Sequence, residues 1–477
     1  MKILRKFICS LLAHRNAILT MHSMAQRFTL VVLVLITFGC SDFVEVDPPR
    51  NTLVSETVFE DPSTVQSALA NLYYSMREER GMVSGTFGLT TAMGIYSDEL
   101  DYYGFEANYS QLYNHNLTAG NDIIMAWWSQ AYRLIYGANA IIEGVESSSQ
   151  LTTMEKNSAK GQALFVRAYI HSLLVSLYGE VPYITTTDYL GNNMVSRMQE
   201  EEVYQNIIGD LKDAIVLLEG FEPTSHERAV PDQYTAKALL SRNYLYIGDW
   251  EMAATLATGL IDVFSLEPNL DQVFLKDSPE TIWQLKPEEG FNTKEAEQLI
   301  IPAVPGQRYA LTDDLVGSFE MGDLRSDHWM GSVSDADGTI TLHYAFKYKA
   351  DLNETTSLEY SIRFRLAEQY LIRAEARVQM GDIGGAQQDL NAVRNRAGLP
   401  DTMADTLNSL LDAIYKERRV ELFAEQGHRW FDLKRSGRAN DVLGEQKTNW
   451  KDTDVLLPLP EAELETNPNL LPQNAGY

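Results

Sequence analysis

The chain has 477 residues, with 39 Lys and Arg against 66 Asp and Glu, which gives a formal net charge of −27. Proteins that bind nucleic acid hold its phosphates with clustered positive charge, so this balance argues against that class of function. With 45% hydrophobic and 22% charged residues, the composition is typical of a globular protein and excludes a long disordered or collagen-like chain.

Residues 1–39 are predicted to be a signal peptide. Residues 28–38 are almost wholly apolar but too few to span a bilayer, which is typical of the core of an export signal. Cys40 follows directly, and an exported chain that begins with its one remaining cysteine is typical of a lipoprotein with fatty acyl chains on Cys40. An ordinary secretory peptide with an incidental cysteine is the alternative. Met21 or Met24 gives a more usual leader start than the first residue.

Residues 40–50 are acidic and end in two prolines, which predicts an extended, lipidated tether. In the body that follows, residues 51–477, no segment approaches the run of about 18 apolar residues that a membrane-spanning helix needs. The lipid is therefore expected to be the only contact with the membrane.

Apolar residues at helical spacing predict a mainly α body. One helix is expected from Asp61-Pro62 to about Gly81, because Asp61 can cap it and proline favours a first helical position. Further helical periods cover residues 122–146, 156–178, 200–219, 233–263, 360–396 and 406–426. We expect one helical domain, with an N-terminal helical part at 51–263, an irregular ligand-binding insertion at 264–359 and a C-terminal helical part with a tail at 360–477.

Two segments have the pattern of a tetratricopeptide-like helical hairpin. Gly248-Asp249 and Gly381-Asp382 lie between helical periods, and small residues follow where paired helices approach closely. The two turns lie much farther apart than one repeat. We therefore expect separate hairpins packed into one helical body, not a regular solenoid.

Metal ligands and catalytic groups form no recognised motif. The eight histidines are dispersed, and neither an HExxH pair nor a GxSxG turn nor a phosphate-binding glycine loop occurs. Residues 335–338 (DADG) resemble part of a calcium loop but lack the carboxylates at its two ends, so an ordinary turn is predicted, with an irregular cation site as the alternative. We predict no catalytic residue, no metal and no cofactor.

Aromatic residues are the most distinctive side chains of the interrupting regions 81–120 and 264–359. Flat rings cover the apolar C–H faces of sugars and also suit peptides. The candidate ligand-binding residues are Tyr102, Tyr103, Trp329 and Tyr344. For Trp127 and Trp128, which begin a strongly periodic helix, packing in the core is the favoured interpretation over a ligand platform.

Several distinctive motifs follow one another in the C-terminal part of the chain: RLAEQYLIRAEA (365–376), LNAVRNRAGL (390–399), ERRVEL (417–422), GHRWFDLKR (427–435) and the ending at 458–477. Together they resemble the SusD/RagB family of starch-binding outer-membrane lipoproteins. The segment YGEVP (178–182) and the tether CSDF (40–43) also look like features of the family. The resemblance therefore extends over nearly the whole exported chain.

The resemblance implies four tetratricopeptide-like hairpins as a scaffold and an irregular remainder that carries the ligand. It also implies a non-catalytic lipoprotein on the outer face of the outer membrane, which captures oligosaccharides and delivers them to a TonB-dependent channel of the SusC type. A receptor for peptides or another nutrient, and a glycoside hydrolase hidden in residues 264–359, are the two alternatives. Charged residues of the shared motifs are expected to form buried ion pairs in the scaffold: Glu417, Arg418, Glu421, Arg429, Asp432 and Arg435.

Overall fold

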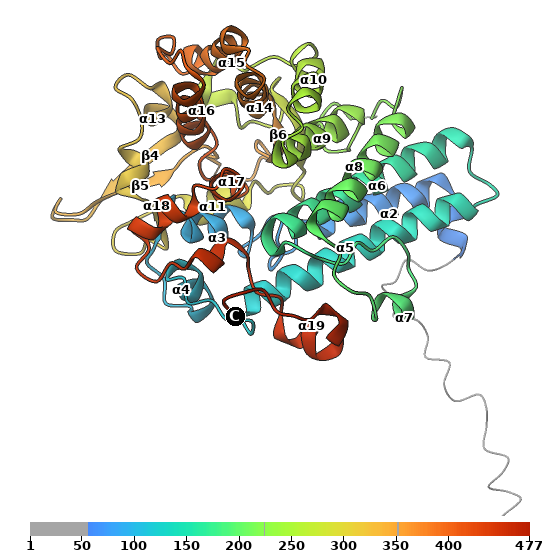
Figure 1. Cartoon of the computed structure of the whole chain (residues 1–477). Helices are drawn as coiled ribbons and strands as arrows, with labels where there is room; N and C mark the ends of the chain where they lie inside the picture. Colours follow the sequence, from blue (N-terminus) through green and yellow to red (C-terminus); the bar gives the residue numbers. More distant parts are fainter. Residues whose placement is uncertain (1–55, 224, 351–352) are drawn as a thin grey trace, which may run out of the picture. The chain divides into compact units, whose positions relative to one another are not determined.

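The computed structural model describes residues 56–223, 225–350 and 353–477. Within them the fold is mainly α, as predicted (Figure 1). The long helices are α2 (Pro62–Ser75), α5 (Asp122–Ser147), α6 (Thr153–Tyr178), α8 (Glu200–Leu217), α9 (Gln233–Ile247), α10 (Trp250–Ile261), α14 (Leu366–Gln379), α15 (Ile383–Arg396) and α16 (Leu407–Glu421).

These helices pack side by side in a continuous row. Helix α5 packs on α6, α6 on α8, α8 on α9 and α9 on α10, and α10 then packs on α14, which contacts α15 and α16 (Figure 1). Trp127 and Trp128 of α5 are buried in the main hydrophobic core, which confirms their assignment to packing. A smaller core cluster lies among α14, α15 and α16.

Glycine turns join two of the helix pairs at the predicted positions. Gly248 (φ 77°) separates α9 from α10, and Gly381 (φ 83°) separates α14 from α15. Only glycine adopts this left-handed conformation at little cost, so the helix can stop and its successor can fold back. The aspartate after each glycine then caps the next helix: Asp249 accepts from the N–H of Met252.

Two boundaries differ from the sequence expectation. Residues 361–365 form strand β6 (Ser361–Arg365) and not the start of a helix, because they pair with β2 (Thr281–Leu285) in the core. Helix α2 ends at Ser75 and not near Gly81. The buried side chain of Gln130 explains this end: its Nε2 donates to the carbonyl of Ser75 at 2.8 Å, and its Oε1 accepts from the N–H of Met82 at 2.7 Å.

Short helices and strands connect the long helices of the row. Among the described residues, three two-stranded antiparallel sheets form: β1 (Leu100–Tyr102) with β3 (Tyr309–Leu311), β2 with β6, and β4 (Met330–Ser334) with β5 (Thr341–Ala345). The region 264–359 is loop-rich but contains four of these strands. The remaining elements are η1 (Glu56–Glu60), α3 (Leu89–Tyr96), α4 (Ala107–Tyr113), α7 (Tyr189–Asn192), η2 (Leu270–Gln272), α11 (Lys294–Leu299), α12 (Asp313–Val316), α13 (Leu324–Trp329), α17 (His428–Arg435), α18 (Ala439–Gln446), η3 (Asp452–Val455), α19 (Glu461–Thr466) and η4 (Pro468–Leu470).

A set of buried charged side chains joins the region 264–359 to α16 and the loop that follows it. We call this set the buried charge network, and its members are Glu280, Asp323, Arg325, Lys347, Arg365, Arg396, Glu417, Glu421 and Glu425. Glu421 accepts hydrogen bonds from Arg325 at 2.8 Å and from Arg365 at 2.6 Å. Arg396 pairs with the same carboxylate. Each charge has its partners inside the protein, so the network fixes how these segments dock.

The other charged residues of the shared C-terminal motifs are also structural. Arg418 and Arg435 both pair with Asp432, at 2.7 and 2.8 Å. Arg429 of α17 makes a two-pronged contact with Asp98, whose carboxylate oxygens lie 2.7 Å from its Nε and Nη2. The expectation of buried ion pairs is therefore confirmed. In the part of the chain that the structure describes, no helix is both long and apolar enough to cross a bilayer.

Candidate functional site

The pairing of β1 with β3 brings two distant tyrosines together. Tyr102 stands opposite Tyr309 in the register, and the N–H of Tyr103 donates to the carbonyl of Arg308 at 2.9 Å. Helix α4 follows four residues later and adds Tyr109. Residues near positions 100 and 310 thus share one surface because a short antiparallel ladder joins them.

Tyrosine rings under this surface form a packed layer. The ring of Tyr102 lies 5.7 Å from the rings of Tyr109 and Tyr309, and those two rings lie 6.3 Å apart. Tyr109 and Tyr309 are only 2% and 1% exposed, whereas Tyr102 is half-buried. Aromatic pairs at such distances stabilise one another by about 0.5–1.5 kcal/mol beyond the area they bury. Tyr102 is therefore held in place from below.

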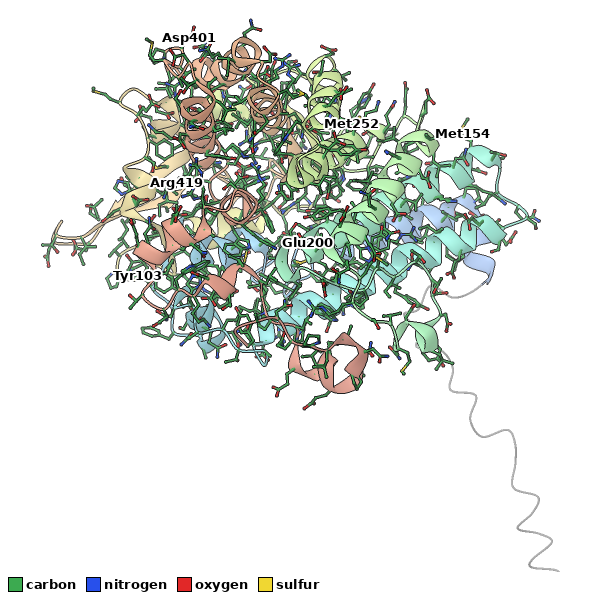
Figure 2. All side chains as sticks on the ribbon, viewed as in Figure 1. Tyr103, Met154, Glu200, Met252, Asp401 and Arg419 are labelled. Carbon is green, nitrogen blue, oxygen red and sulfur yellow. The ribbon has the colours of Figure 1, made fainter. Side chains whose placement is uncertain are left out.

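The residues that follow Tyr102 in the chain expose aromatic side chains to solvent. Tyr103 is 39% exposed and Phe105 is 99% exposed. Gly104 between them is needed because the ring of Tyr102 lies where its side chain would be. Figure 2 labels Tyr103, which lies on the same side of the view as Arg419 and away from Met154 on the long helices. We call Tyr102, Tyr103, Phe105 and Arg308 the aromatic loop face.

Charged groups border the aromatic loop face. The guanidinium of Arg308 lies 4.8 Å from the ring centre of Tyr109, and its Nη2 lies 3.1 Å from the carboxylate of Glu106. The hydroxyl of Tyr102 donates to Glu106, and this bond holds the pKa of Glu106 below its ordinary value. Burial and the carboxylates of Asp101 and Asp313 raise the pKa of Tyr103. This surface therefore offers ring faces beside both acceptors and a cationic donor.

Tyr344 lies on the hairpin formed by β4 and β5. It stands opposite Gly331, and its half-buried ring lies across that glycine. Strand β5 runs close to β3, so the hairpin adjoins the aromatic loop face. At the hairpin tip, Asp335 accepts from the backbone N–H groups of Thr339 at 2.7 Å and Ile340 at 3.1 Å. The sequence DADG is therefore a turn, as predicted, and the Asp335 carboxylate closes it.

Trp329 is not on the surface, which corrects its prediction as a ligand-binding residue. Its side chain is 0% exposed, and its indole N–H donates to the carbonyl of Leu270 at 2.9 Å. The ring packs edge-on against Phe274. It also covers three cations of the buried charge network: Lys347 at 4.9 Å, Arg396 at 5.3 Å and Arg365 at 5.8 Å. The polar neighbours in sequence suggested exposure, but they belong to a short helix that turns this residue inward.

The candidate ligand-binding residues predicted from the sequence did not include Phe105 or Arg308. Phe105 stands within the tyrosine-rich segment, and its Gly and Glu neighbours were a usable signal of exposure. Arg308 had no such signal, because its place beside Tyr109 depends on the β1–β3 pairing. Cys40, the predicted lipid attachment site, and the rest of the tether lie outside the described residues.

A polar cleft of about 360 Å³ opens beside α12, between α16, α17 and α18. Arg419 lines it and bridges Asp98 (2.8 Å) and Asp314 (2.6 Å), so the cleft adjoins the segment that leads into β1. Its other cations are also paired: Lys416 with Glu320, Arg429 with Asp98, and Arg438 with Asp412. The cleft is therefore part of the scaffold that holds the aromatic loop face. Among the described residues, no group of three His, Cys, Asp or Glu side chains is placed to hold a metal ion.

The structure is a mainly α-helical scaffold with exposed aromatic side chains on a loop. Comparisons with known proteins identify the family. A family model described as "Starch-binding associating with outer membrane" matches residues 42–245, and the model of the SusD family matches residues 318–477. The chain belongs to the SusD family, also called SusD/RagB, as the C-terminal motifs predicted. This family associates with the outer membrane.

Three similar proteins match along nearly their whole length. SusD-like protein P2 of Formosa agariphila is 29% identical over 520 aligned positions, which cover 94% of this chain and 99% of the relative. A SusD superfamily protein from Bacteroides vulgatus has the same fold, with a TM-score of 0.78 and 21% identity over 88% of this chain and 100% of that chain. Surface glycan-binding protein A from Bacteroides thetaiotaomicron, solved with laminarihexaose, is similar with a TM-score of 0.73 and 18% identity, covering 86% of this chain and 99% of that one.

Proposed function

We propose that this protein captures glycans on the aromatic loop face. The observation that carries the proposal is the pair of exposed rings, Tyr103 and Phe105, on a layer of packed tyrosines. Tyrosine and phenylalanine side chains have few rotatable bonds, so an exposed ring loses little conformational freedom when a sugar packs on it. The membership of the SusD family and the laminarihexaose complex of a protein with this fold support the same function.

The charges around the face favour neutral glycans. Asp101, Glu106 and Asp313 are carboxylates close to the rings, and Arg308 is already engaged by Glu106. A uronate or sulfate ester placed here meets like charge, in a protein with a formal net charge of −27. Sugar hydroxyls, by contrast, can donate to the carboxylates and accept from Arg308.

The same carboxylates favour binding without catalysis. Glycoside hydrolysis needs a carboxylic acid that is still protonated near neutral pH, and this requires a raised pKa. The pKa of Glu106 is lowered, first by the hydrogen bond from Tyr102. Asp101 accepts a hydrogen bond from the hydroxyl of Tyr113 at 2.8 Å. Both carboxylates therefore suit the role of fixed acceptors, and pure protein is expected to release no reducing sugar from a polysaccharide panel.

Two further parts of the proposal concern where the protein is anchored and which protein receives the bound oligosaccharide. We propose that Cys40 carries the lipid anchor on the outer face of the outer membrane, and that the bound oligosaccharide passes to a TonB-dependent channel of the SusC type. Labelling with a palmitate analogue tests the anchor: the natural chain is expected to take up label, and C40A to take up none. Purification from detergent-extracted membranes tests the partner, and recovery of the chain without any such channel counts against the transfer step.

Affinity electrophoresis and calorimetry test the binding face. The full chain is run in gels that contain laminarin, starch or anionic polygalacturonate, and is titrated with laminarihexaose and maltohexaose. Y103A and F105A are each expected to weaken binding about five- to tenfold, the loss of one ring contact, while the melting temperature stays unchanged because both rings are exposed.

An exposed tyrosine elsewhere provides the control. Tyr74 of α2 is 55% exposed, so Y74A should leave both mobility and affinity as they are. Unchanged binding in Y103A and F105A, with a glycan that the natural chain retains, contradicts the proposed face. A peptide that co-purifies with the protein, together with no retention by any glycan, favours the peptide receptor instead.

A further inference from the structure

A cavity of about 410 Å³ lies away from the aromatic loop face, between α5, the segment 182–195 and the C-terminal elements α19 and η4. Its size is within the range of about 300–1,000 Å³ that is usual for small-molecule sites. None of the four residues of the aromatic loop face lines it. The two surfaces are therefore distinct.

Aromatic side chains form the walls of this cavity. Trp128, Tyr132 and Tyr136 lie at intervals of four residues on α5, so one stripe of the helix presents all three. The rings of Trp128 and Tyr132 lie 4.9 Å apart, and Tyr189 of α7 lines the cavity from the other side. Tyr189 is 65% exposed although the two rings beneath it are buried or half-buried. One ring of the site is thus free to cover a ligand.

Polar groups stand among these rings. Glu463 of α19 lines the cavity and accepts a hydrogen bond from Trp128, and its burial raises the pKa of its carboxyl. Asn193 lies exposed at the mouth beside Asn192. Ring faces with a carboxyl and amides at their edges match the two kinds of surface on a sugar ring, the apolar C–H face and the hydroxyl rim.

The walls are fixed by hydrogen bonds between segments that are far apart in sequence. Asn467 donates to the carbonyl of Val195 at 2.8 Å, and Asn469 donates to the carbonyl of Met194 at 2.7 Å. The hydroxyl of Tyr132 donates to the carbonyl of Pro182 at 3.0 Å. The tail thus holds the segment 182–195 over α5, and the cavity is already formed before any ligand arrives.

We propose that this cavity is a second saccharide site, which takes one or two sugar rings stacked between Tyr189 and the half-buried rings of Tyr132 and Tyr136 on α5. Glu463 accepts from their hydroxyls, and Asn193 both donates and accepts at the mouth. The assignment rests on the proposed function only in that the ligand is a glycan; the site itself is separate from the aromatic loop face.

Hydrogen–deuterium exchange of the full chain tests this assignment, because it locates binding along the sequence. Laminarihexaose, maltohexaose, xylohexaose and mannohexaose are the probes. At least one is expected to slow exchange in the segment 182–195 at saturation. Y189A combined with N193A should remove this protection or weaken the probe at this site about tenfold, the loss of one ring contact and its hydrogen bonds.

Two control variants make the result specific. Leu190 is 67% exposed beside Tyr189 but does not line the cavity, so L190A should keep the protection. Y103A combined with F105A disables the aromatic loop face and should also keep it. If L190A removes the protection as fully as the double variant does, the protection does not depend on the residues that line the cavity, and the saccharide assignment is wrong.

The remaining outcomes separate the two proposals. Protection around residues 100–113 without any change in 182–195 overturns the second site and leaves the proposed function standing. The second site is also overturned if Y103A combined with F105A removes the protection in 182–195. In that case the slower exchange follows from binding at the aromatic loop face and not from a ligand in the cavity. If no probe protects either region, both proposals fail.

Discussion

The buried charge network and the aromatic loop face use polar side chains in opposite ways. In the network, Glu421 accepts from three guanidinium groups and is 0% exposed, so its charge is fully occupied within the protein. On the aromatic loop face, Tyr103 and Phe105 keep their rings in solvent while the tyrosines beneath them are packed. The polar groups of the first region are paired within the protein and stabilise the fold, whereas the second region leaves ring faces exposed that can contact a ligand. Changes in the first should therefore alter stability, and changes in the second should alter binding.

The largest effect is expected when the network loses a cation. R365M removes the group that contacts Glu280, Glu421 and Glu425 and leaves their carboxylates short of a partner. Breaking a buried ion pair in this way costs about 3–5 kcal/mol of unfolding free energy. Urea unfolding followed by circular dichroism measures the loss, and glycan affinity of the folded fraction should stay the same.

An exposed arginine gives the matched control for that change. Arg438 pairs with Asp412, and their side chains are 40% and 64% exposed. Such surface pairs contribute about 0–1 kcal/mol, so R438M should unfold nearly as the natural chain does. Equal losses in R365M and R438M would remove the distinction between buried and exposed charge on which this comparison depends.

A smaller loss is expected from R429A. Arg429 contacts both carboxylate oxygens of Asp98, which is 0% exposed in its side chain, but Arg419 still pairs with that carboxylate at 2.8 Å. We therefore expect about 3 kcal/mol, at the lower end of the range for a broken buried pair. Thermal melting and glycan titration are measured together. A normal melting temperature with lost glycan binding contradicts the structural role.

The sequence could predict the scaffold better than the site. Helical spacing and the turns at Gly248 and Gly381 predict local structure, because caps and glycine conformations depend on near neighbours. Strand β6 was missed because residues 361–365 become a strand only by pairing with β2, which lies far away in the chain. A tertiary partner decided that segment, and no local signal reports such a partner.

The candidate site shows the same limit in its individual residues. Tyr102 and Tyr103 lie next to each other because a single short segment carries both, and their role in ligand binding stays a prediction. The prediction that Trp329 binds a ligand was wrong. Its polar neighbours in sequence suggested exposure, whereas the ring is buried over cations from positions 347, 365 and 396. Arg308 was not found because its neighbours on α4 are distant in sequence. Side chains such as Arg308, which tertiary pairing brings to a binding site on a loop, cannot be found from their neighbours in sequence.

The pH dependence of stability sharpens the comparison at a residue between the two regions. Burial, and then the neighbouring Asp98, raise the pKa of Glu99 from 4.5 to about 8. Between those values the unfolded chain has released this proton while the folded chain keeps it, so stability falls as pH rises through the window. We expect Glu99 to contribute up to about 1.4 kcal/mol to this fall for each pH unit of the window.

Chemical unfolding at a series of pH values from 5 to 8 measures the slope, with E99Q as the comparison. Glutamine cannot ionise, so E99Q should be about as stable as the natural chain at the acid end and lose less stability toward the alkaline end. Asp98 stays ionised throughout because Arg429 and Arg419 lower its pKa. Parallel slopes for the two proteins would show that Glu99 is not the group that titrates.

The smallest effect is expected at Tyr344, and it decides how far the aromatic loop face extends. The ring is half-buried across Gly331 on a hairpin that adjoins β3. If a glycan chain continues from Tyr103 onto the hairpin, Y344A should weaken a hexasaccharide about threefold, a share of one ring contact. A disaccharide, too short to reach the hairpin, should bind Y344A and the natural chain equally. Because a partly exposed hairpin ring contributes little to the core, unfolding should change by about 0.5 kcal/mol or less. Calorimetry with the two chain lengths separates the outcomes: equal weakening for both places Tyr344 beside Tyr103, and no weakening for either restricts the face to the loop between β1 and α4.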